Sequence, residues 1–105
     1  SELNIKINLK DGWKINDLGP SFINLLKLVG DHKADLVSSF DWYAINSQKM
    51  KLLKLINGEN YLLQGTIYYC EDKKNALCYI KSYEQKILPD SDVEIEDIEI
   101  DIGEL

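Results

Sequence analysis

Residues 2–10 alternate polar and apolar side chains without a break, with leucine or isoleucine at every odd position from Leu3 to Leu9. Successive side chains of a β-strand point to opposite faces of a sheet, so this pattern predicts a half-buried strand. Asp11-Gly12 then supplies a turn. Residues 13–15 can follow that turn as a short second strand.

The next twenty residues carry the spacing of amphipathic helices. Gly19-Pro20-Ser21 is typical of a helix start, because proline is favoured at the first helical position. The apolar residues that follow recur three and four positions apart: Phe22, Leu25, Leu26 and Val29. Gly30 would end this helix in the left-handed conformation, and residues 31–40 are expected to form a second, shorter helix.

Two interpretations are open for residues 47–56. Ser47 can cap a helix, because the lysine, methionine and leucine that dominate this stretch are good helix formers. Asn57-Gly58, placed between two apolar runs, is a strong signal for a β-hairpin. Because a clean alternation of apolar and polar residues is missing here, the pattern favours the helix, with Gly58 as its end.

Three strands are predicted in the second half of the chain. Residues 61–70 and 76–83 are rich in tyrosine, isoleucine and leucine, and they flank a polar turn. Both faces of these strands carry apolar side chains, which is typical of strands covered on two sides. A last strand is expected over residues 92–102, where the alternation shifts its phase at Glu96-Asp97, as a β-bulge would produce.

These elements predict an α+β fold, with one antiparallel sheet of about four to five strands and two to three helices packed on it. A length of 105 residues predicts a single globular domain over residues 1–105. The N-terminal residues lack the apolar core of a secretory signal. No apolar run reaches the ~20 residues that a membrane-spanning helix needs, so no membrane partner is expected.

The cysteines and the absence of arginine bear on two questions, which are the cellular compartment of the chain and whether it binds nucleic acid. Cys70 and Cys78 are too few for a disulfide framework or, with His32, for a zinc site, so we expect free thiols in the cytoplasm. A three-residue turn at residues 73–75 would nevertheless place the two cysteines opposite each other, where a cross-strand disulfide is possible.

All twelve basic residues are lysine. Since arginine is the residue that reads phosphates and bases through its planar fork, its absence argues against nucleic-acid binding.

No arrangement of residues predicts catalysis. The only histidine, His32, stands in a polar turn without a recognisable nucleophile and oriented base. The glycines never cluster into a phosphate-binding loop. Residues 90–94 begin like a calcium loop, but Ile95 occupies the position where that loop requires glycine. We therefore predict that the chain is not an enzyme and that it uses no cofactor or metal.

The charge of the chain is concentrated at its C-terminal end. Residues 90–105 hold eight acidic side chains and no lysine, whereas the remainder carries a charge of +2, which gives −6 overall. On the predicted last strand, same-face residues would lie ~6.6–6.8 Å apart. The carboxylates expected to share the exposed face are Glu94, Glu96, Glu99 and Asp101. A rigid row of this kind can attract a basic partner, or it can serve only to keep an edge strand from aggregating.

Aromatic residues supply candidate anchors for a partner. The neighbours in each of the pairs Trp42-Tyr43 and Tyr68-Tyr69 cannot both be buried on one face of a strand, so we expect one residue of each pair to point away from the core. Tyrosine is a frequent anchor in protein interfaces, because it is large and rigid and has a polar tip.

Small size, acidity and the lack of a catalytic motif together resemble the acidic immunity proteins of bacterial toxin systems. The resemblance implies a one-to-one complex in which the chain neutralises a basic protein partner, specifically a nuclease toxin. The alternative is an adaptor module whose last strand pairs with the sheet edge of a partner. The candidate partner-binding residues are Asp92, Glu94, Glu96, Glu99, Asp101, Tyr43 and Tyr68.

Overall fold

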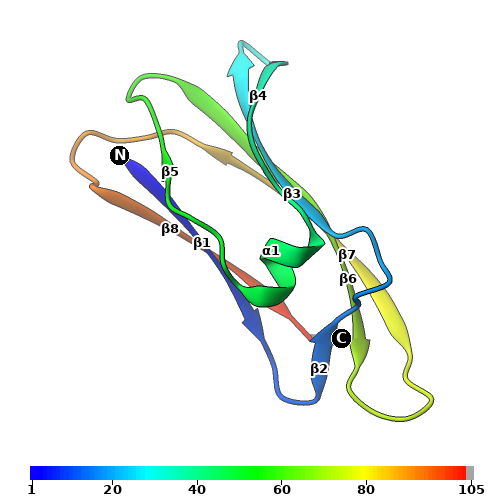
Figure 1. The fold of residues 1–105 in the computed structure, drawn as a ribbon. Coiled ribbons are helices and arrows are strands. Elements are labelled where there is room, and N and C mark those ends of the chain that lie inside the picture. Colours follow the sequence, from blue (N-terminus) through cyan, green and yellow to red (C-terminus); the bar gives the residue numbers. More distant parts are fainter. Residues whose placement is uncertain (104–105) are drawn as a thin grey trace.

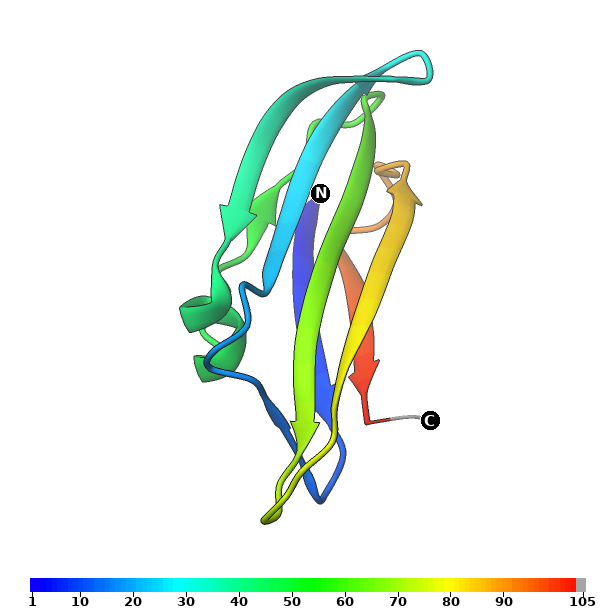
Figure 2. The ribbon, with the colours of Figure 1, turned by 90° about the vertical axis from the view of Figure 1, so that its right-hand side faces the viewer.

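The computed structural model describes residues 1–103, except for the side chain of Ala34, and within this range it contains eight strands and one short helix. The two sheets pack face to face as a β-sandwich (Figures 1 and 2). The predicted α+β fold with two to three helices is therefore wrong. The elements are β1 (Glu2–Leu9), β2 (Trp13–Ile15), β3 (Phe22–Val29), β4 (His32–Phe40), α1 (Trp42–Ser47), β5 (Leu53–Lys54), β6 (Asn60–Glu71), β7 (Cys78–Ile87) and β8 (Ile95–Ile102).

The larger sheet has five strands and the smaller sheet has three. In the larger sheet, β6 pairs with β7 on one side and with β3 and then β2 on the other, and β4 pairs with β3. All of these pairings are antiparallel. The smaller sheet has the order β5-β1-β8, in which β1 and β8 run parallel. The first and last strands of the chain therefore lie side by side in one sheet, with the two termini at its opposite ends (Figure 1).

The inner faces of the two sheets form the core. The largest fully buried side chains come from both sheets and from α1: Leu3, Ile23, Leu25, Ile45, Leu63, Ile67, Ile100 and Ile102. Each fully buried aliphatic side chain contributes ~1.5–3 kcal/mol to folding through loss of contact with water. At the end of the sandwich where β2 lies, Trp13, Tyr69 and Tyr79 close the core with ring centroids 5.5–5.6 Å apart.

Residues 22–40 form a β-hairpin in place of the two predicted helices. Val29 pairs with His32, so Gly30-Asp31 is a two-residue turn. The positive φ of 62° at Gly30 serves this turn rather than a helix end. Two register shifts between β3 and β4 interrupt the alternation of apolar residues. This irregular spacing and the many leucines, which favour helices, produced the helical pattern.

The structure also corrects the prediction for residues 47–56. The helix α1 lies earlier, where the Asp41 carboxylate accepts a hydrogen bond from the Ala44 N–H at 3.0 Å and caps its first turn. Gln48 ends it with a φ of 55°. The expected turn at Asn57-Gly58 is present, with a φ of 88° at Gly58. It connects β5 of one sheet to β6 of the other and so does not form a hairpin.

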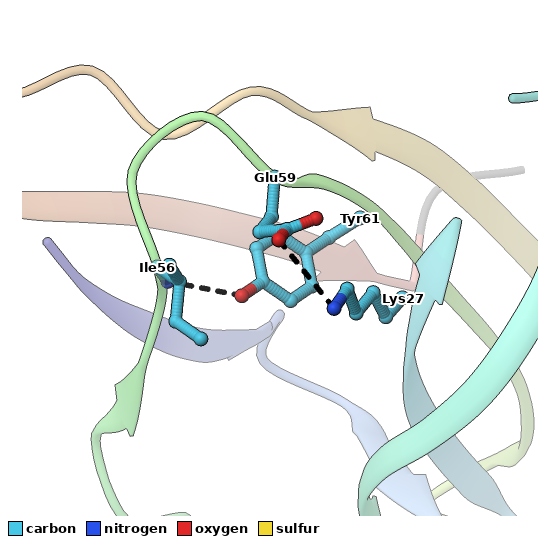
Figure 3. A network of polar contacts seen from close by, with 4 residues as sticks. All are labelled: Lys27, Ile56, Glu59 and Tyr61. Atoms are coloured by element: carbon cyan, nitrogen blue, oxygen red, sulfur yellow. Dashed lines mark hydrogen bonds and ion pairs between the residues drawn. The ribbon is translucent and has the colours of Figure 1, made fainter. Parts of the chain in front are cut away.

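A buried tyrosine holds this turn against the core (Figure 3). The Tyr61 side chain is only 2% exposed, and its hydroxyl accepts a hydrogen bond from the Ile56 N–H at 2.9 Å. Next to it, Lys27 and Glu59 form a half-exposed ion pair at 3.5 Å. The hydrogen bond of the tyrosine hydroxyl is part-buried, whereas the ion pair is open to solvent, so the hydroxyl is the more important of these two contacts for stability.

The predicted strands at residues 61–70 and 76–83 are confirmed as the hairpin β6–β7. Cys70 pairs with Cys78 across it, and the two form a disulfide. The expectation of free thiols is therefore wrong, whereas the cross-strand placement is confirmed. Disulfides persist mainly in oxidising compartments, which weakens the argument for a cytoplasmic location. Within residues 1–103, no helix has the length and the apolar character needed to cross a membrane.

Candidate functional site

The acidic strand β8 begins at Ile95, three residues later than predicted. Its parallel pairing with β1 runs from Glu2 opposite Ile95 to Leu9 opposite Ile102 without a register shift. The predicted β-bulge at Glu96-Asp97 is therefore wrong. Regular alternation buries every second residue of the strand: Ile98, Ile100 and Ile102.

Three carboxylates share the exposed outer face of β8: Asp97, Glu99 and Asp101. Two of them are held by amides of β1, because Asn4 Nδ2 donates to Asp97 Oδ1 at 3.0 Å and Asn8 Nδ2 donates to Asp101 Oδ1 at 2.9 Å. Glu99, between them, makes no side-chain hydrogen bond or ion pair within residues 1–103. One oxygen of each amide-bonded carboxylate and both oxygens of Glu99 are left to accept further hydrogen bonds. We call these three carboxylates the acidic row.

The other predicted acidic residues do not belong to the acidic row. Glu96 lies on the inner side of β8 and is half-buried. Asp92 and Glu94 precede the strand, in an exposed turn where the Asp90 carboxylate accepts a hydrogen bond from the Asp92 N–H at 2.9 Å. Of the four carboxylates expected on one face, the structure therefore brings together only Glu99 and Asp101.

The two candidate tyrosines lie on other surfaces. Tyr43 is 61% exposed on α1, with its ring edge-on to that of Trp42 at a centroid distance of 6.1 Å. Tyr68 is half-buried on the outer face of the larger sheet, whereas Tyr69 points into the core, as expected for one member of that pair. Figure 2 shows α1 and β8 on opposite sides of the molecule. The tyrosines and the acidic row thus do not form one site.

Asp97 and the two asparagines of β1 were missed in the sequence. A signal was present, because Asn4 and Asn8 are four residues apart on the polar face of the first strand. The acids that they bind, Asp97 and Asp101, have the same spacing. The equal spacing could have suggested that the two asparagines bind the two aspartates. Only the parallel pairing of β1 with β8 places these side chains next to each other.

One backbone edge of β8 faces away from β1. The Glu94 and Ile102 carbonyls accept hydrogen bonds from the Glu2 and Lys10 amides at 2.9 and 3.0 Å, so the backbone N–H and C=O groups of the even-numbered residues in this segment face β1. The backbone groups of Asp97, Glu99 and Asp101 consequently lie on the free edge. Lys81 of β7 covers one end of this edge, where its Nζ donates to the Asp101 carbonyl at 2.7 Å. An inward-pointing lysine of this kind limits pairing with other strands.

Among residues 1–103, two side chains have a shifted pKa, and neither lies in the acidic row. The pKa of Glu71 is lowered from its ordinary 4.5, first by the Leu77 N–H, which donates to its carboxylate at 3.0 Å, and then by Lys73 at 3.1 Å. Burial raises the pKa of the Tyr83 hydroxyl. Both groups serve the β6–β7 hairpin, since Glu71 orders its turn and Tyr83 packs against the core.

The hollows of the surface do not gather catalytic groups. One hollow, of about 310 Å³, lies on the outer face of the larger sheet and is lined by residues that include Phe22, Thr66, Ser82 and Glu84. In the described part of the chain, no three histidine, cysteine, aspartate or glutamate side chains are grouped as metal ligands would be. The acidic row on β8 is thus the most organised group of charged side chains.

The chain is therefore a β-sandwich with an ordered, negatively charged row on the outer face of its smaller sheet. Comparison with known proteins gives no family model that matches the sequence and no curated protein that is significantly similar to it. The argument for function therefore depends on the geometry of the chain itself.

Proposed function

We propose that this chain is a small binding protein that neutralises a basic protein partner through the acidic row on β8. The observation that carries the proposal is the unbroken parallel pairing of β8 with β1, which fixes three carboxylates on one exposed face. Because the amides of Asn4 and Asn8 already hold two of them, little side-chain entropy remains to be lost on binding.

Ion pairs with the acidic row would supply only part of the affinity for a basic partner. An exposed ion pair contributes ~0.2–1 kcal/mol, so three pairs supply at most about 3 kcal/mol. The larger electrostatic effect is on the rate of association, since the eight acids at this end of the chain steer a basic surface toward it. An apolar contact is available in the same row, where Ile95 is 45% exposed beside Asp97.

The finer form of the proposal is an immunity protein that inhibits a nuclease toxin. A nuclease must hold phosphates with positive charge, and a fixed row of carboxylates complements such a surface. The chain has the size, the acidity and the ordered acidic face that this role needs. A cytoplasmic site of action also belongs to this form, and there the β6–β7 hairpin must remain folded after reduction of its disulfide.

The direct test compares two variants that lose the same charge. The test variant neutralises the acidic row: Asp97→Asn, Glu99→Gln and Asp101→Asn. The control neutralises three exposed acids elsewhere: Asp11→Asn, Asp17→Asn and Glu84→Gln. Each immobilised protein is exposed to an extract of the source organism, and the retained proteins are identified by mass spectrometry.

We expect the wild-type chain and the control to retain a basic protein that the test variant loses. Retention should also weaken between about 0.1 and 1 M salt, where the Debye length falls from ~10 to ~3 Å. For the nuclease form, one equivalent of the chain should abolish nucleic-acid cleavage by the captured protein. Equal retention by the test variant, with no dependence on salt, would overturn the electrostatic proposal.

A second candidate function is strand pairing through the free edge of β8. The specific observation in its favour is that the backbone groups of Asp97 and Glu99 face outward without a partner strand in the described chain. Glu99→Pro removes an outward N–H and leaves the β1 ladder intact, and Glu99→Gln controls for the lost charge. Loss of partner binding in the proline variant alone, with an unchanged circular dichroism spectrum, would favour strand pairing over charge.

A further inference from the structure

The hollow of about 310 Å³ on the outer face of the larger sheet lies over three neighbouring strands, β3, β6 and β7 (Figure 2). Phe22 of β3 stands opposite Thr66 of β6, and Thr66 stands opposite Ser82 of β7. Directly opposed residues of antiparallel strands share one face of the sheet, and Ile23 and Ile67 occupy the other face, in the core. The two short side chains next to the phenylalanine ring therefore leave space on the solvent side.

The next row of the same face supplies polar groups to the hollow. Gln64 stands opposite Glu84, and both line the hollow. The Gln64 carbonyl oxygen accepts a hydrogen bond from Lys33 Nζ at 3.1 Å, and both N–H groups of its amide remain available. Within residues 1–103, the Glu84 carboxylate and the hydroxyls of Thr66 and Ser82 form no side-chain hydrogen bond or ion pair. The hollow thus offers a ligand donors and acceptors that the fold itself does not use.

Phe22 gives the hollow an apolar wall. Its side chain is 38% exposed, although its neighbours along the chain, Ser21 and Ile23, are buried. The face of an aromatic ring carries a partial negative charge. The C–H groups on one face of a sugar ring are slightly positive, so that face stacks on such a wall, while the hydroxyls at the rim of the sugar need polar partners. An aromatic wall beside a few free polar groups therefore suits a sugar ring.

The charges around the hollow favour a neutral ligand. Glu84 would repel an anion such as a phosphate ester. Two lysines oppose a cation, because Lys33 is bonded to Gln64 and Lys86 lies two residues beyond Glu84 on the same face of β7. Lys86 is in turn 3.9 Å from the Asp31 carboxylate. These two acids and two lysines sum to zero, so the surroundings of the hollow select neither sign.

We infer that this hollow binds one pyranose ring of a neutral saccharide. The apolar face of the ring packs on Phe22, and two neighbouring ring hydroxyls donate to the Glu84 carboxylate in charge-assisted hydrogen bonds. Gln64 Nε2 and Ser82 Oγ donate to other hydroxyl oxygens. The volume is at the lower end of the ~300–1,000 Å³ typical of small-ligand sites, so the expected occupant is a single ring. The inference is independent of the proposed function, because it concerns the other sheet and an uncharged ligand.

The test is a titration of the intact, isotope-labelled chain with the methyl glycosides of glucose, galactose, mannose and N-acetylglucosamine, followed by NMR. At least one glycoside should bind with a Kd of ~1 mM, the weak affinity expected for contacts with a single small ring. The amide signals that should shift most are those of Phe22, Gln64, Thr66, Ser82 and Glu84, whereas the signals of β8 should stay in place. Glycerol at the same concentration has hydroxyls but no ring, and it should not shift these signals.

Matched variants separate binding in the hollow from general effects on the fold. Phe22→Ala should raise the Kd about tenfold because the stacking wall is lost, and Phe22→Trp should keep it within about threefold. Trp42→Ala removes an aromatic side chain of similar exposure, 39%, on α1, and it should leave the Kd unchanged. Glu84→Gln should raise the Kd about tenfold, because its hydrogen bonds lose their charge. Asp11→Asn, at an exposed turn, is its control.

Glu84→Gln also separates this inference from the proposed function, since it belongs to the control for the acidic row. That variant should lose the sugar and still retain the basic protein. Three results would each overturn the inference: no glycoside shifts the signals of the hollow, glycerol shifts them equally, or Phe22→Ala binds as tightly as the wild-type chain. Tighter binding of adenosine at the same signals would overturn it as well, because it would identify a nucleobase as the occupant.

Discussion

The placement of β8 is tested by two substitutions of the same residue type on one strand, Ile100→Ala and Ile95→Ala. Ile100 is 1% exposed in the core, whereas Ile95 is 45% exposed on the outer face. Removing a fully buried isoleucine side chain down to alanine costs about 2–5 kcal/mol, including the cavity that remains. Ile95→Ala removes the same three carbons, at ~0.8 kcal/mol each when fully buried, and so costs about 1 kcal/mol at half burial.

Urea unfolding measures both losses as changes in the free energy of unfolding. Ile100→Ala should therefore lower the free energy of unfolding by at least about 2 kcal/mol, and Ile95→Ala by about 1 kcal/mol. A β-bulge at Glu96-Asp97 would place both isoleucines in the core and make the two losses equal. Equal losses would thus refute the regular strand and, with it, the acidic row.

Four further predictions are checked by the same unfolding measurements against the wild-type chain. Tyr61→Phe should cost about 0.5–1.5 kcal/mol, because it removes the hydrogen bond to the part-buried Ile56 amide. Gly65→Ala should cost about 1–3 kcal/mol, since its Cβ would lie 2.6 Å from a carbonyl of β3. Replacing both Cys70 and Cys78 with serine should cost about 2.5 kcal/mol for a sequence separation of 8. Glu71→Gln should destabilise the chain fully above pH 4.5, and the difference from wild type should disappear as pH falls below 4.5 and through the lowered pKa of the folded state. An unchanged midpoint in any of these variants contradicts the contact concerned.

Several strands were predictable because their patterns are local. The strict alternation of residues 2–10 gives β1 within one residue at each end. The hairpin β6–β7 is marked by two tyrosine-rich runs on either side of a polar turn, and its register places Cys70 opposite Cys78 as expected. In these segments the period of the side chains, the residue types and the turn all favour the same structure.

The hairpin β3–β4 was misread because its local signals conflict. Phe22, Leu25 and Val29 have helical spacing, yet in the structure Leu25 is buried and Phe22 and Val29 are exposed. Leucine tolerates both structures, and packing between the sheets decides in favour of the strand. Glycine followed by aspartate between two apolar runs is itself a hairpin signal, and at Gly30 it was interpreted only as a helix end.

The acidic row was predicted only in part, because its face depends on a partner from the other end of the chain. In the sequence, Val93 and Ile95 are out of phase with Ile98, so burying all three on one face would require a β-bulge between Ile95 and Ile98. The eight-residue ladder with β1 keeps a constant register instead and turns Ile95 outward. Parallel pairing between residues more than ninety positions apart leaves no local mark in the sequence.

Strand β1 connects the core to the acidic row through its alternation. Its even-numbered residues Asn4 and Asn8 hold the acidic row, and its odd-numbered residues Ile5 and Ile7 supply core side chains. A slip of one residue against β8 would exchange the two faces, which would bury the amides and expose the isoleucines. The burial of Ile5 and Ile7 therefore fixes the register that the acidic row needs, so the stability of the fold and the geometry of the acidic row depend on the same pairing.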